Sequence, residues 1–88
     1  MVRYKIVFSK QAVKDKNLLK QAGLENKAKA ILNKMVENPY ITPPPYEILR
    51  GNLSGFYSRR INIKHRIVYE VFESEHIIRI LRMWTYYE

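Results

Sequence analysis

The chain has no cysteine, and its basic side chains outnumber its carboxylates by two to one. The absence of cysteine excludes disulfides, thiolate metal sites and cysteine nucleophiles, and it permits a reducing cytosol. Eight Asp and Glu against sixteen Lys and Arg leave a formal net charge of +8. This balance favours an anionic partner, which can be nucleic acid, a ribosome surface, anionic lipid or an acidic protein. Charge alone does not choose among them, and a basic soluble protein without such a partner is a further alternative.

Long apolar runs are also missing. None approaches the roughly 20 residues that a membrane-spanning helix needs. The first ten residues, MVRYKIVFSK, hold too short an apolar run for a signal peptide and lack a cleavage site of small residues. We therefore expect a soluble, cytoplasmic protein with no membrane partner. A length of 88 residues predicts a single domain over residues 1–88, because the chain is too short for two separate cores.

The first part of the chain predicts a strand followed by a helix. Residues 4–8 (YKIVF) are rich in β-branched and aromatic side chains, which favour a strand. Ser9 is suited to cap the helix that follows. The pattern of residues 10–20 is weakly amphipathic and basic, and Gly23 is the residue expected to end this helix.

A second helix has a clearer pattern. Apolar side chains recur three and four residues apart between Leu24 and Met35, which predicts one stripe packed on a sheet. Asn38 and Pro39 stop this helix, since proline supplies no backbone donor and constrains the residue before it. Three consecutive prolines at residues 43–45 then stiffen a connector. The connector either fixes the residues that follow it or is only a spacer.

The rest of the chain predicts four strands, at residues 46–49, 56–63, 66–72 and 76–84. Turn residues separate them, and a tight turn around Lys64 makes the middle two a β-hairpin. Arg79 and Arg82 are three residues apart in the last strand, which predicts that they lie on opposite faces of the sheet. The order of elements predicts an α+β fold with two N-terminal helices packed on one face of a small, twisted, mainly antiparallel sheet. The other face is left for function.

Basic and aromatic side chains alternate along the predicted hairpin. Alternation places Arg59 and Arg60 on opposite faces, so at most one of them points into a given site. Arg66 is expected to lie across the hairpin from Arg60 or Asn62. Neighbouring guanidinium groups repel each other, and a phosphate between them relieves that repulsion through bidentate hydrogen bonds. The alternative partners are carboxylates in weak, exposed ion pairs: Glu70, Glu73 and Glu75.

Glu47 is the only carboxylate between Glu37 and Glu70. That position makes it the available general base in basic surroundings, with a merely solvated side chain as the alternative. His65 is expected at the hairpin turn, where it contacts RNA or has no role. His65 and His76 have no companions at metal-ligand spacing, and the sequence has no phosphate-binding glycine loop. We therefore predict neither a metal nor a cofactor.

An aromatic tail, with Trp84, Tyr86 and Tyr87, ends the sequence. Such rings can stack on the unpaired bases of single-stranded RNA, and they can equally clamp the end of the sheet to the core. We favour the core for Trp84 and an RNA contact for the two tyrosines, which lie beyond the regular strand.

The segment NLSGFYSRRINIKHRIVYEV, preceded by Glu47 and followed by RMWTYYE, resembles the YoeB/Txe branch of the RelE/ParE superfamily of bacterial toxins. The likeness extends over nearly the whole chain and is sharp from Glu47 onward. It implies a RelE/YoeB-like fold and a type II toxin–antitoxin toxin. The implied activity is that of an mRNA interferase, a ribosome-dependent endoribonuclease that cleaves mRNA in the A site. The implied chemistry is metal-independent attack by a ribose 2′-hydroxyl on the adjacent phosphate.

The resemblance also implies partners and residue roles. The partners are the ribosome, mRNA and an acidic, partly disordered antitoxin similar to YefM/Axe, in a hetero-oligomer or beside a toxin homodimer. By position, Glu47 matches the family's general base and Arg66 the residue that stabilises charge on the scissile phosphate. The two side chains are therefore expected to converge on one phosphodiester on the helix-free side of the sheet. Four further residues are predicted to bind RNA: Arg59, Arg60, His65 and Tyr87.

The chain departs from the family pattern at its end. Many relatives have a histidine there as general acid, in SHYE or YHY, whereas this chain has TYYE, with Tyr86 at the histidine position. A phenol with a pKa of roughly 10 can donate a proton at neutral pH but is a weaker acid than imidazolium. Tyr86 is therefore a slower acid, an orienting group or a mark of reduced activity. Two alternative functions follow from the same fold: inhibition of DNA gyrase in the manner of ParE, and non-catalytic binding of RNA or antitoxin.

Overall fold

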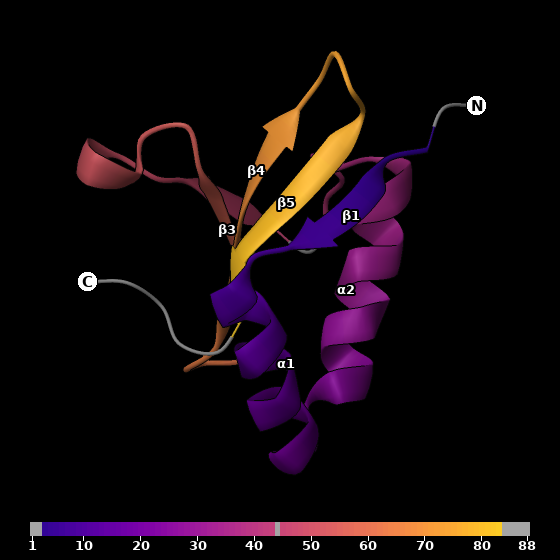
Figure 1. Ribbon diagram of the computed structural model, residues 1–88, viewed down its shortest axis with the longest axis vertical. Coiled ribbons are helices and arrows are strands. Elements are labelled where there is room, and N and C mark those ends of the chain that lie inside the picture. The colour runs from indigo at the N-terminus through magenta and orange to yellow at the C-terminus, as the bar shows by residue number, and fades with distance from the viewer. Residues whose placement is uncertain (1–2, 44, 84–88) are drawn as a thin grey trace.

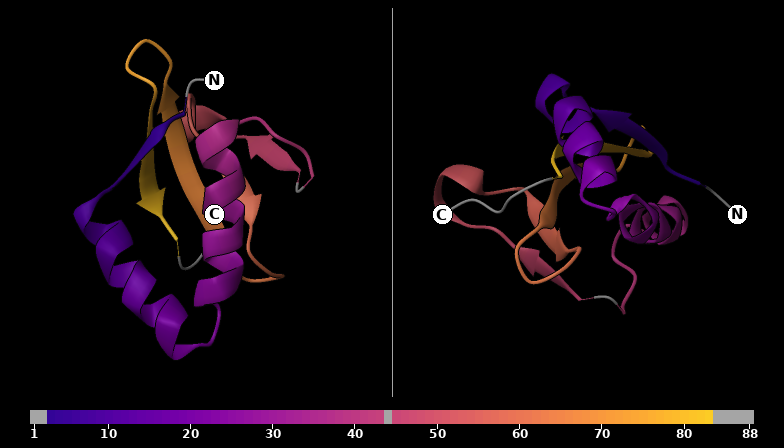
Figure 2. Two further views of the ribbon diagram at one scale, coloured as in Figure 1. Left: turned by 90° about the vertical axis from the view of Figure 1, so that its right-hand side faces the viewer. Right: turned by 90° about the horizontal axis from the view of Figure 1, so that it is seen from below.

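The computed structural model of the protein describes residues 3–43 and 45–83. The elements within these residues are, in order, β1 (Lys5–Phe8), α1 (Lys10–Gln21), α2 (Glu25–Glu37), β2 (Tyr46–Ile48), a 3₁₀ turn (Gly51–Leu53), β3 (Tyr57–Arg60), β4 (Arg66–Phe72) and β5 (Ile77–Arg82). The described chain forms one five-stranded sheet in the order β1-β5-β4-β3-β2. β1 pairs with β5 in parallel, and every other pair is antiparallel. Both helices lie on the same side of the sheet (Figures 1 and 2), which confirms the predicted α+β fold.

Local signals fix both helices. The Ser9 hydroxyl accepts a hydrogen bond from the backbone N–H of Ala12 at 3.0 Å, so it caps α1 as predicted. Gly23, with φ 76°, follows the last turn of α1 in the left-handed conformation that glycine adopts at low cost. α2 ends at Glu37, directly before Asn38 and Pro39, as the proline pattern predicts. Neither helix in the described part of the chain has the length and apolar character needed to cross a membrane.

The apolar stripes of the two helices meet the inner face of the sheet. The buried core consists of Ala12, Leu19, Ala28, Leu32, Met35, Ile61, Ile67, Tyr69, Ile78, Ile80 and Met83. Along β4, Ile67 and Tyr69 belong to this core, and Val68 between them projects from the opposite face. That helix-free face carries the outward-pointing residues of β2, β3 and β4.

The hairpin between β3 and β4 has a longer turn than predicted. The side-chain oxygen of Asn62 accepts hydrogen bonds from the backbone N–H groups of Lys64 at 2.9 Å and His65 at 2.8 Å. Asn side chains commonly hold turns in this way. β3 therefore ends at Arg60, and the prediction that this strand extends to residue 63 is wrong.

A β-bulge changes the face on which Arg82 lies. Tyr69 pairs with Ile80, but Val68 pairs with Arg82, so Leu81 has no partner in β4. The extra residue shifts the alternation of side chains by one position. Arg82 and Arg79 therefore pair with residues on the same side of β4, Val68 and Glu70. The prediction of opposite faces is wrong, because it assumed an unbroken strand.

Candidate active site

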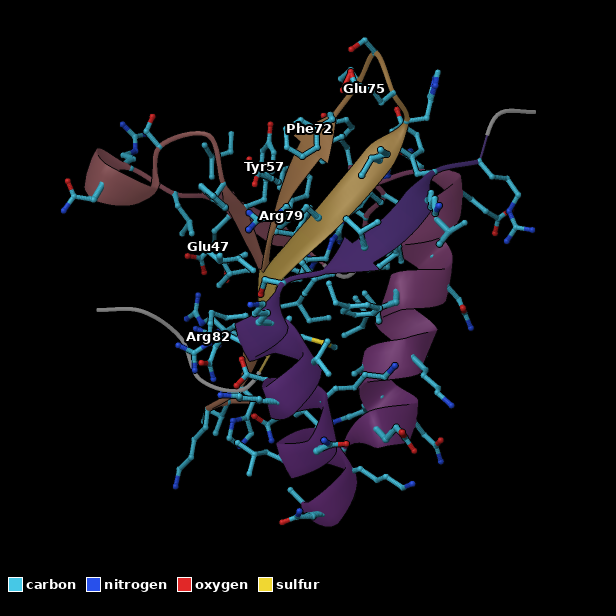
Figure 3. The ribbon with its side chains drawn as sticks, viewed as in Figure 1. Glu47, Tyr57, Phe72, Glu75, Arg79 and Arg82 are labelled. Atoms are coloured by element: carbon cyan, nitrogen blue, oxygen red, sulfur yellow. The ribbon has the colours of Figure 1, made fainter. Side chains whose placement is uncertain are left out.

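The two residues expected to act on a phosphodiester meet on the helix-free face. Arg66 Nη1 lies 3.1 Å from Glu47 Oε1. Glu47 comes from the edge strand β2 and Arg66 from β4, with β3 between them. Adjacent strands are about 4.8 Å apart, so both side chains must reach over β3 to make this contact. The prediction that these two side chains converge is confirmed, and Figure 3 shows Glu47 on the side of the sheet away from α2.

Strand pairing explains how Glu47 reaches this face. Tyr46 is opposite Arg59 on β3, and the guanidinium of Arg59 lies 5.1 Å from the centre of the Tyr46 ring. This cation–π contact holds Tyr46 toward the core side of the sheet. Because side chains alternate along a strand, the next residue, Glu47, projects from the opposite face. Its cross-strand partner there is Ser58.

Arg59 belongs to the interior, not to the candidate site. Its side chain is 1% exposed. The Nε group donates to Tyr69 Oη at 3.0 Å, and Nη2 donates to the backbone oxygen of Pro39 at 2.8 Å. Burial raises the pKa of Tyr69, and the neighbouring Arg59 cation opposes that rise. The prediction that Arg59 binds RNA is therefore wrong, because its donors are used inside the protein.

Arg60 is the hairpin arginine that faces outward. It is exposed and lies directly opposite Arg66 in the register of β3 and β4. One of the two cross-strand positions predicted for Arg66 is thus confirmed. Two guanidinium groups and one carboxylate, Glu47, therefore share a small area, where the excess of positive charge suits an anion.

A hollow of about 260 Å³ lies beside the ion pair, lined by Pro45, Glu47, Ser58 and Arg60. Pro45 is the last of the three connector prolines, so the connector forms part of the wall around Glu47. Ser58 is 3% exposed, and its hydroxyl has no hydrogen-bond partner among the residues that the structure describes. Sequence reasoning missed Ser58, although its place two residues before Arg60 indicated a shared face.

The alternative carboxylate partners of the arginines have other contacts. Glu70 pairs with Arg79 at 2.8 Å between Oε2 and Nη1. Glu73 accepts hydrogen bonds from the hydroxyls of Tyr4 at 2.5 Å and Tyr40 at 2.6 Å, and these lower the pKa of the Glu73 carboxyl. Glu47 is the carboxylate that meets Arg66.

The remaining predicted site residues divide into two groups. His65 is half-buried in the turn before β4, where its backbone oxygen accepts from the N–H of Ile61 at 2.8 Å. Trp84, Tyr86 and Tyr87 lie outside the described residues. Across residues 3–43 and 45–83, no three His, Cys, Asp or Glu side chains are grouped so that they could hold a metal ion.

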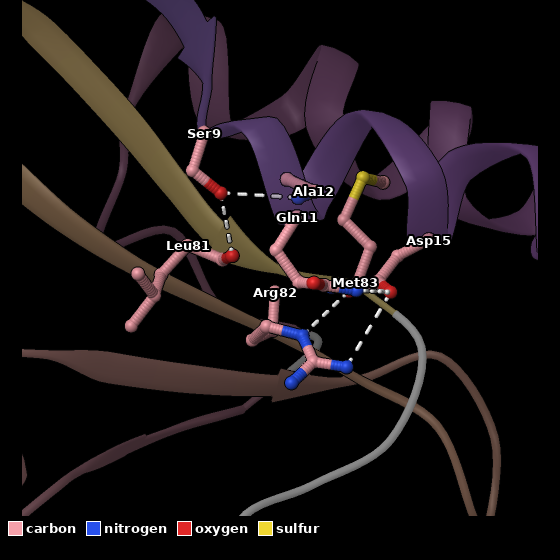
Figure 4. Close-up of polar contacts among 7 residues, drawn as sticks. All are labelled: Ser9, Gln11, Ala12, Asp15, Leu81, Arg82 and Met83. Atoms are coloured by element: carbon pink, nitrogen blue, oxygen red, sulfur yellow. Dashed lines mark hydrogen bonds and ion pairs between the residues drawn. The ribbon is translucent and has the colours of Figure 1, made fainter.

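A buried carboxylate, which sequence reasoning missed, anchors the strand that leads to the tail. Asp15 on α1 has no exposed surface. It accepts hydrogen bonds from Arg82 Nε at 2.7 Å, the Met83 backbone N–H at 3.1 Å and Gln11 Nε2 at 3.2 Å (Figure 4). Burial alone would raise the pKa of Asp15, but these hydrogen bonds outweigh it and the pKa is lowered. Asp15 thereby fixes the end of β5 against α1.

Comparisons with known proteins identify the family of this chain. A family profile described as YoeB-like toxin of bacterial type II toxin–antitoxin system matches residues 8–87. Toxin YoeB of Synechocystis sp. is 41% identical over 64 residues, which are 73% of this chain and 67% of that protein.

Solved structures agree as well. A YoeB/ParE toxin from Agrobacterium tumefaciens has a TM-score of 0.86 at 25% identity, over 94% of this chain and 99% of the other. YoeB in the heterotetrameric YoeB–YefM complex from Staphylococcus aureus has a TM-score of 0.81 at 34% identity, over 98% and 100%. Since the family profile covers nearly the whole sequence, the chain belongs to the YoeB-like toxins of bacterial type II toxin–antitoxin systems.

Proposed function

We propose that this toxin is a ribosome-dependent endoribonuclease that cleaves mRNA in the A site by attack of a ribose 2′-hydroxyl on the adjacent phosphate. The observation that carries the proposal is the 3.1 Å contact between Glu47 and Arg66 on the helix-free face. A base and a phosphate-binding cation that touch each other can also touch neighbouring atoms of one nucleotide. In-line transesterification needs both groups within such a distance.

The reaction assigns a role to each group. Glu47 takes the proton of the 2′-hydroxyl as the 2′-oxygen bonds to phosphorus. Arg66 and Arg60 stabilise the negative charge that builds on the nonbridging oxygens. The bond from phosphorus to the 5′-oxygen breaks, and a general acid protonates the leaving oxygen. The products are a 2′,3′-cyclic phosphate and a 5′-hydroxyl. Tyr86 stands at the family's general-acid position, and Tyr87 and His65 are proposed RNA contacts.

The exposure of Glu47 supports the proposal that a substrate phosphate can break its ion pair with Arg66. The side chain of Glu47 is 59% exposed, whereas that of Arg66 is 15% exposed. An ion pair with a solvated partner contributes only about 0–1 kcal/mol, so a phosphate can replace the Glu47 carboxylate at Arg66 at little cost. Glu47 is then released next to the sugar of the nucleotide that carries this phosphate.

The charge of the whole chain supports an RNA-rich partner. A net charge of +8 on 88 residues favours association with ribosomal RNA and mRNA. In the related structure from Staphylococcus aureus, YoeB and YefM form a heterotetrameric toxin–antitoxin complex. We propose that this chain also binds a cognate antitoxin of the YefM/Axe kind, whose acidic, partly disordered segment folds onto the toxin and inhibits it in the cytoplasm.

The test uses the purified protein in a translating extract, with new mRNA 5′ ends mapped by primer extension. Wild-type protein should produce translation-dependent cuts. Glu47→Gln and Arg66→Ala should each reduce the cleavage rate by about 10²–10⁴-fold with little change in the thermal unfolding midpoint. Glu75→Gln, in the distant β4–β5 turn, is the matched control and should cleave as wild type.

Two results would contradict the proposal. Normal cleavage by both Glu47→Gln and Arg66→Ala would remove the assigned roles. Inhibition of DNA gyrase by wild-type protein, with no RNA cleavage, would instead establish the ParE-like alternative.

A further inference from the structure

Ser58 lies at the centre of the candidate site with its hydroxyl unsatisfied. In the register of the sheet it stands between Glu47 on β2 and Val68 on β4. It is 3% exposed, and no hydrogen bond to its Oγ exists among the described residues. Nearly all buried polar side-chain atoms in proteins have a partner, so a partnerless hydroxyl of this kind requires an explanation.

The ion pair lies on the same face of the sheet as Ser58. Glu47 and Arg66 come from strands on either side of β3, and their side chains join on the face from which Ser58 projects. Ser58 thus lies on the strand that the Glu47–Arg66 ion pair spans. The small side chain of Ser58 does not fill the hollow that it lines together with Glu47 and Arg60.

We propose that Ser58 is a further substrate-binding residue, whose hydroxyl donates a hydrogen bond to a nonbridging oxygen of the RNA phosphodiester. This inference deepens the proposed function and rests on it. When the phosphate binds Arg66 and breaks its ion pair with Glu47, the two side chains move apart and Ser58 Oγ becomes accessible to the phosphate. The hydroxyl rotates freely to meet an acceptor. It breaks no internal hydrogen bond to do so, because it makes none with the described residues.

The surrounding charges favour a phosphate as the acceptor. Arg60 and Arg66 are cross-strand neighbours, two pairs along the hairpin from Ser58 and therefore on the same face. Their guanidinium groups can hold two oxygens of a tetrahedral anion, and a third donor from Ser58 completes the set. A base edge carries no net charge, so it would not relieve the repulsion between the two guanidinium groups as a phosphate does.

The experiment measures binding apart from cleavage. Fluorescence anisotropy gives the Kd of a short single-stranded DNA, which cannot be cleaved by a 2′-hydroxyl, and of the matching RNA with wild type and with Ser58→Ala. No ribosomes are present, and both strands are measured with the same proteins, so that DNA and RNA binding can be compared directly. Ser58→Ala should weaken binding of both strands about tenfold, the effect of one hydrogen bond to a charged oxygen. Ser74→Ala, in the distant turn, is the control and should bind normally.

Two further readouts separate a substrate contact from a structural role. The thermal unfolding midpoint of Ser58→Ala should equal or exceed that of wild type, because a buried unsatisfied hydroxyl is removed. The slope of log Kd against log salt should also stay unchanged, since serine carries no charge. Arg60→Ala should reduce that slope by about 0.7, the contribution of one phosphate contact on a single strand.

Each contrary outcome is distinct. Unchanged binding by Ser58→Ala would overturn the inference, and so would a fall in the unfolding midpoint as large as that expected for loss of an internal hydrogen bond. Weakening of RNA binding alone would assign the hydroxyl to the 2′-oxygen and overturn the phosphate contact. Absence of cleavage by wild type, with the binding results as expected, would refute the nuclease proposal and leave the phosphate site standing.

Discussion

Arg59 and Arg60 are adjacent arginines on opposite faces of β3. Arg59 is 1% exposed and donates to Tyr69 and to the backbone of Pro39, while Arg60 is exposed beside the candidate site. A buried cation with several hydrogen bonds leaves its acceptors unsatisfied when it is removed. Removing a solvated cation leaves no buried acceptor unsatisfied. Arg59 should therefore contribute to stability, and Arg60 to RNA binding.

Substituting each of these arginines by methionine separates stability from binding. Arg59→Met should lower the free energy of unfolding by about 2–4 kcal/mol, because the Tyr69 hydroxyl loses its donor and the Pro39 oxygen keeps only the Tyr69 hydroxyl of its two donors. Arg60→Met should change it by no more than about 0.5 kcal/mol and should weaken RNA binding instead. Urea denaturation and anisotropy measure the two effects. Equal stability of the two variants would contradict the assignment of Arg59 to the interior.

Asp15 predicts a dependence of stability on pH. Its folded pKa is lowered from the model-compound value of 3.8. A carboxyl with a lowered folded pKa contributes stability that is present above the unfolded pKa and is lost as the pH falls through the folded pKa. At pH 7, Asp15→Asn should therefore lower the free energy of unfolding by about 2 kcal/mol, since charge-assisted bonds to Arg82 and Met83 are lost.

Urea denaturation of wild type and Asp15→Asn at several pH values measures this difference. It should be constant from pH 7 to about pH 5 and shrink below about pH 4. Subtracting the two proteins removes the contributions of the other carboxylates. A difference that grows on acidification would contradict a lowered pKa.

Residue identity alone predicted some of the site. Glu47 stood out as an isolated carboxylate in basic surroundings, and Arg66 matched a family motif. Asp15 did not stand out, because a lone aspartate in a lysine-rich helix is usually a solvated residue. The Ser58 hydroxyl was equally hidden, since its lack of a partner depends on which strands flank it.

At the level of elements, the regularity of β3 and the bulge in β5 decide from which face of the sheet each arginine projects. Period-two alternation correctly separated Arg59 from Arg60, because β3 is regular over that stretch. The same rule failed for Arg82, because Leu81 is an extra residue opposite β4. Bulges depend on pairing with a neighbouring strand, and a pattern within one strand does not reveal them. The helix predictions succeeded because caps and stop residues act within a few positions.

Ser9 joins α1 to β5 through one hydroxyl. It caps α1 by accepting from Ala12 and also donates to the backbone oxygen of Leu81 at 2.8 Å (Figure 4). Ser9→Ala should therefore lower the free energy of unfolding by about 1–2 kcal/mol, toward the upper end of the range for loss of an N-cap. Thermal or urea denaturation checks this, with Ser74→Ala as the exposed control. A loss no larger than that of the control would show that the cap and the bond to β5 are not stabilising.

At the level of the whole molecule, the two faces of the sheet have different roles, one in the core and the other in the candidate site. The helices and the inner face of the sheet make the core, and the helix-free face brings together Glu47, Arg60 and Arg66 from three strands. Segments that are far apart in the sequence thus form the site only after the sheet has paired. The order of elements nevertheless predicted the fold class. The family motif predicted the convergence of Glu47 with Arg66, which the sequence pattern alone would not have shown. The sequence could not predict the hollow beside them, because that depends on the connector as well.

The central claim is that Glu47 and Arg66 act on the 2′-hydroxyl and the phosphate of a single nucleotide. The most direct measurement uses programmed ribosomes carrying an mRNA with one 2′-deoxynucleotide immediately 5′ of the mapped cut. An all-ribose mRNA serves as the reference. The account predicts that this single substitution abolishes cleavage at that bond while the reference is cut to give a 2′,3′-cyclic phosphate. Cleavage of the deoxy-substituted bond at the reference rate would contradict it.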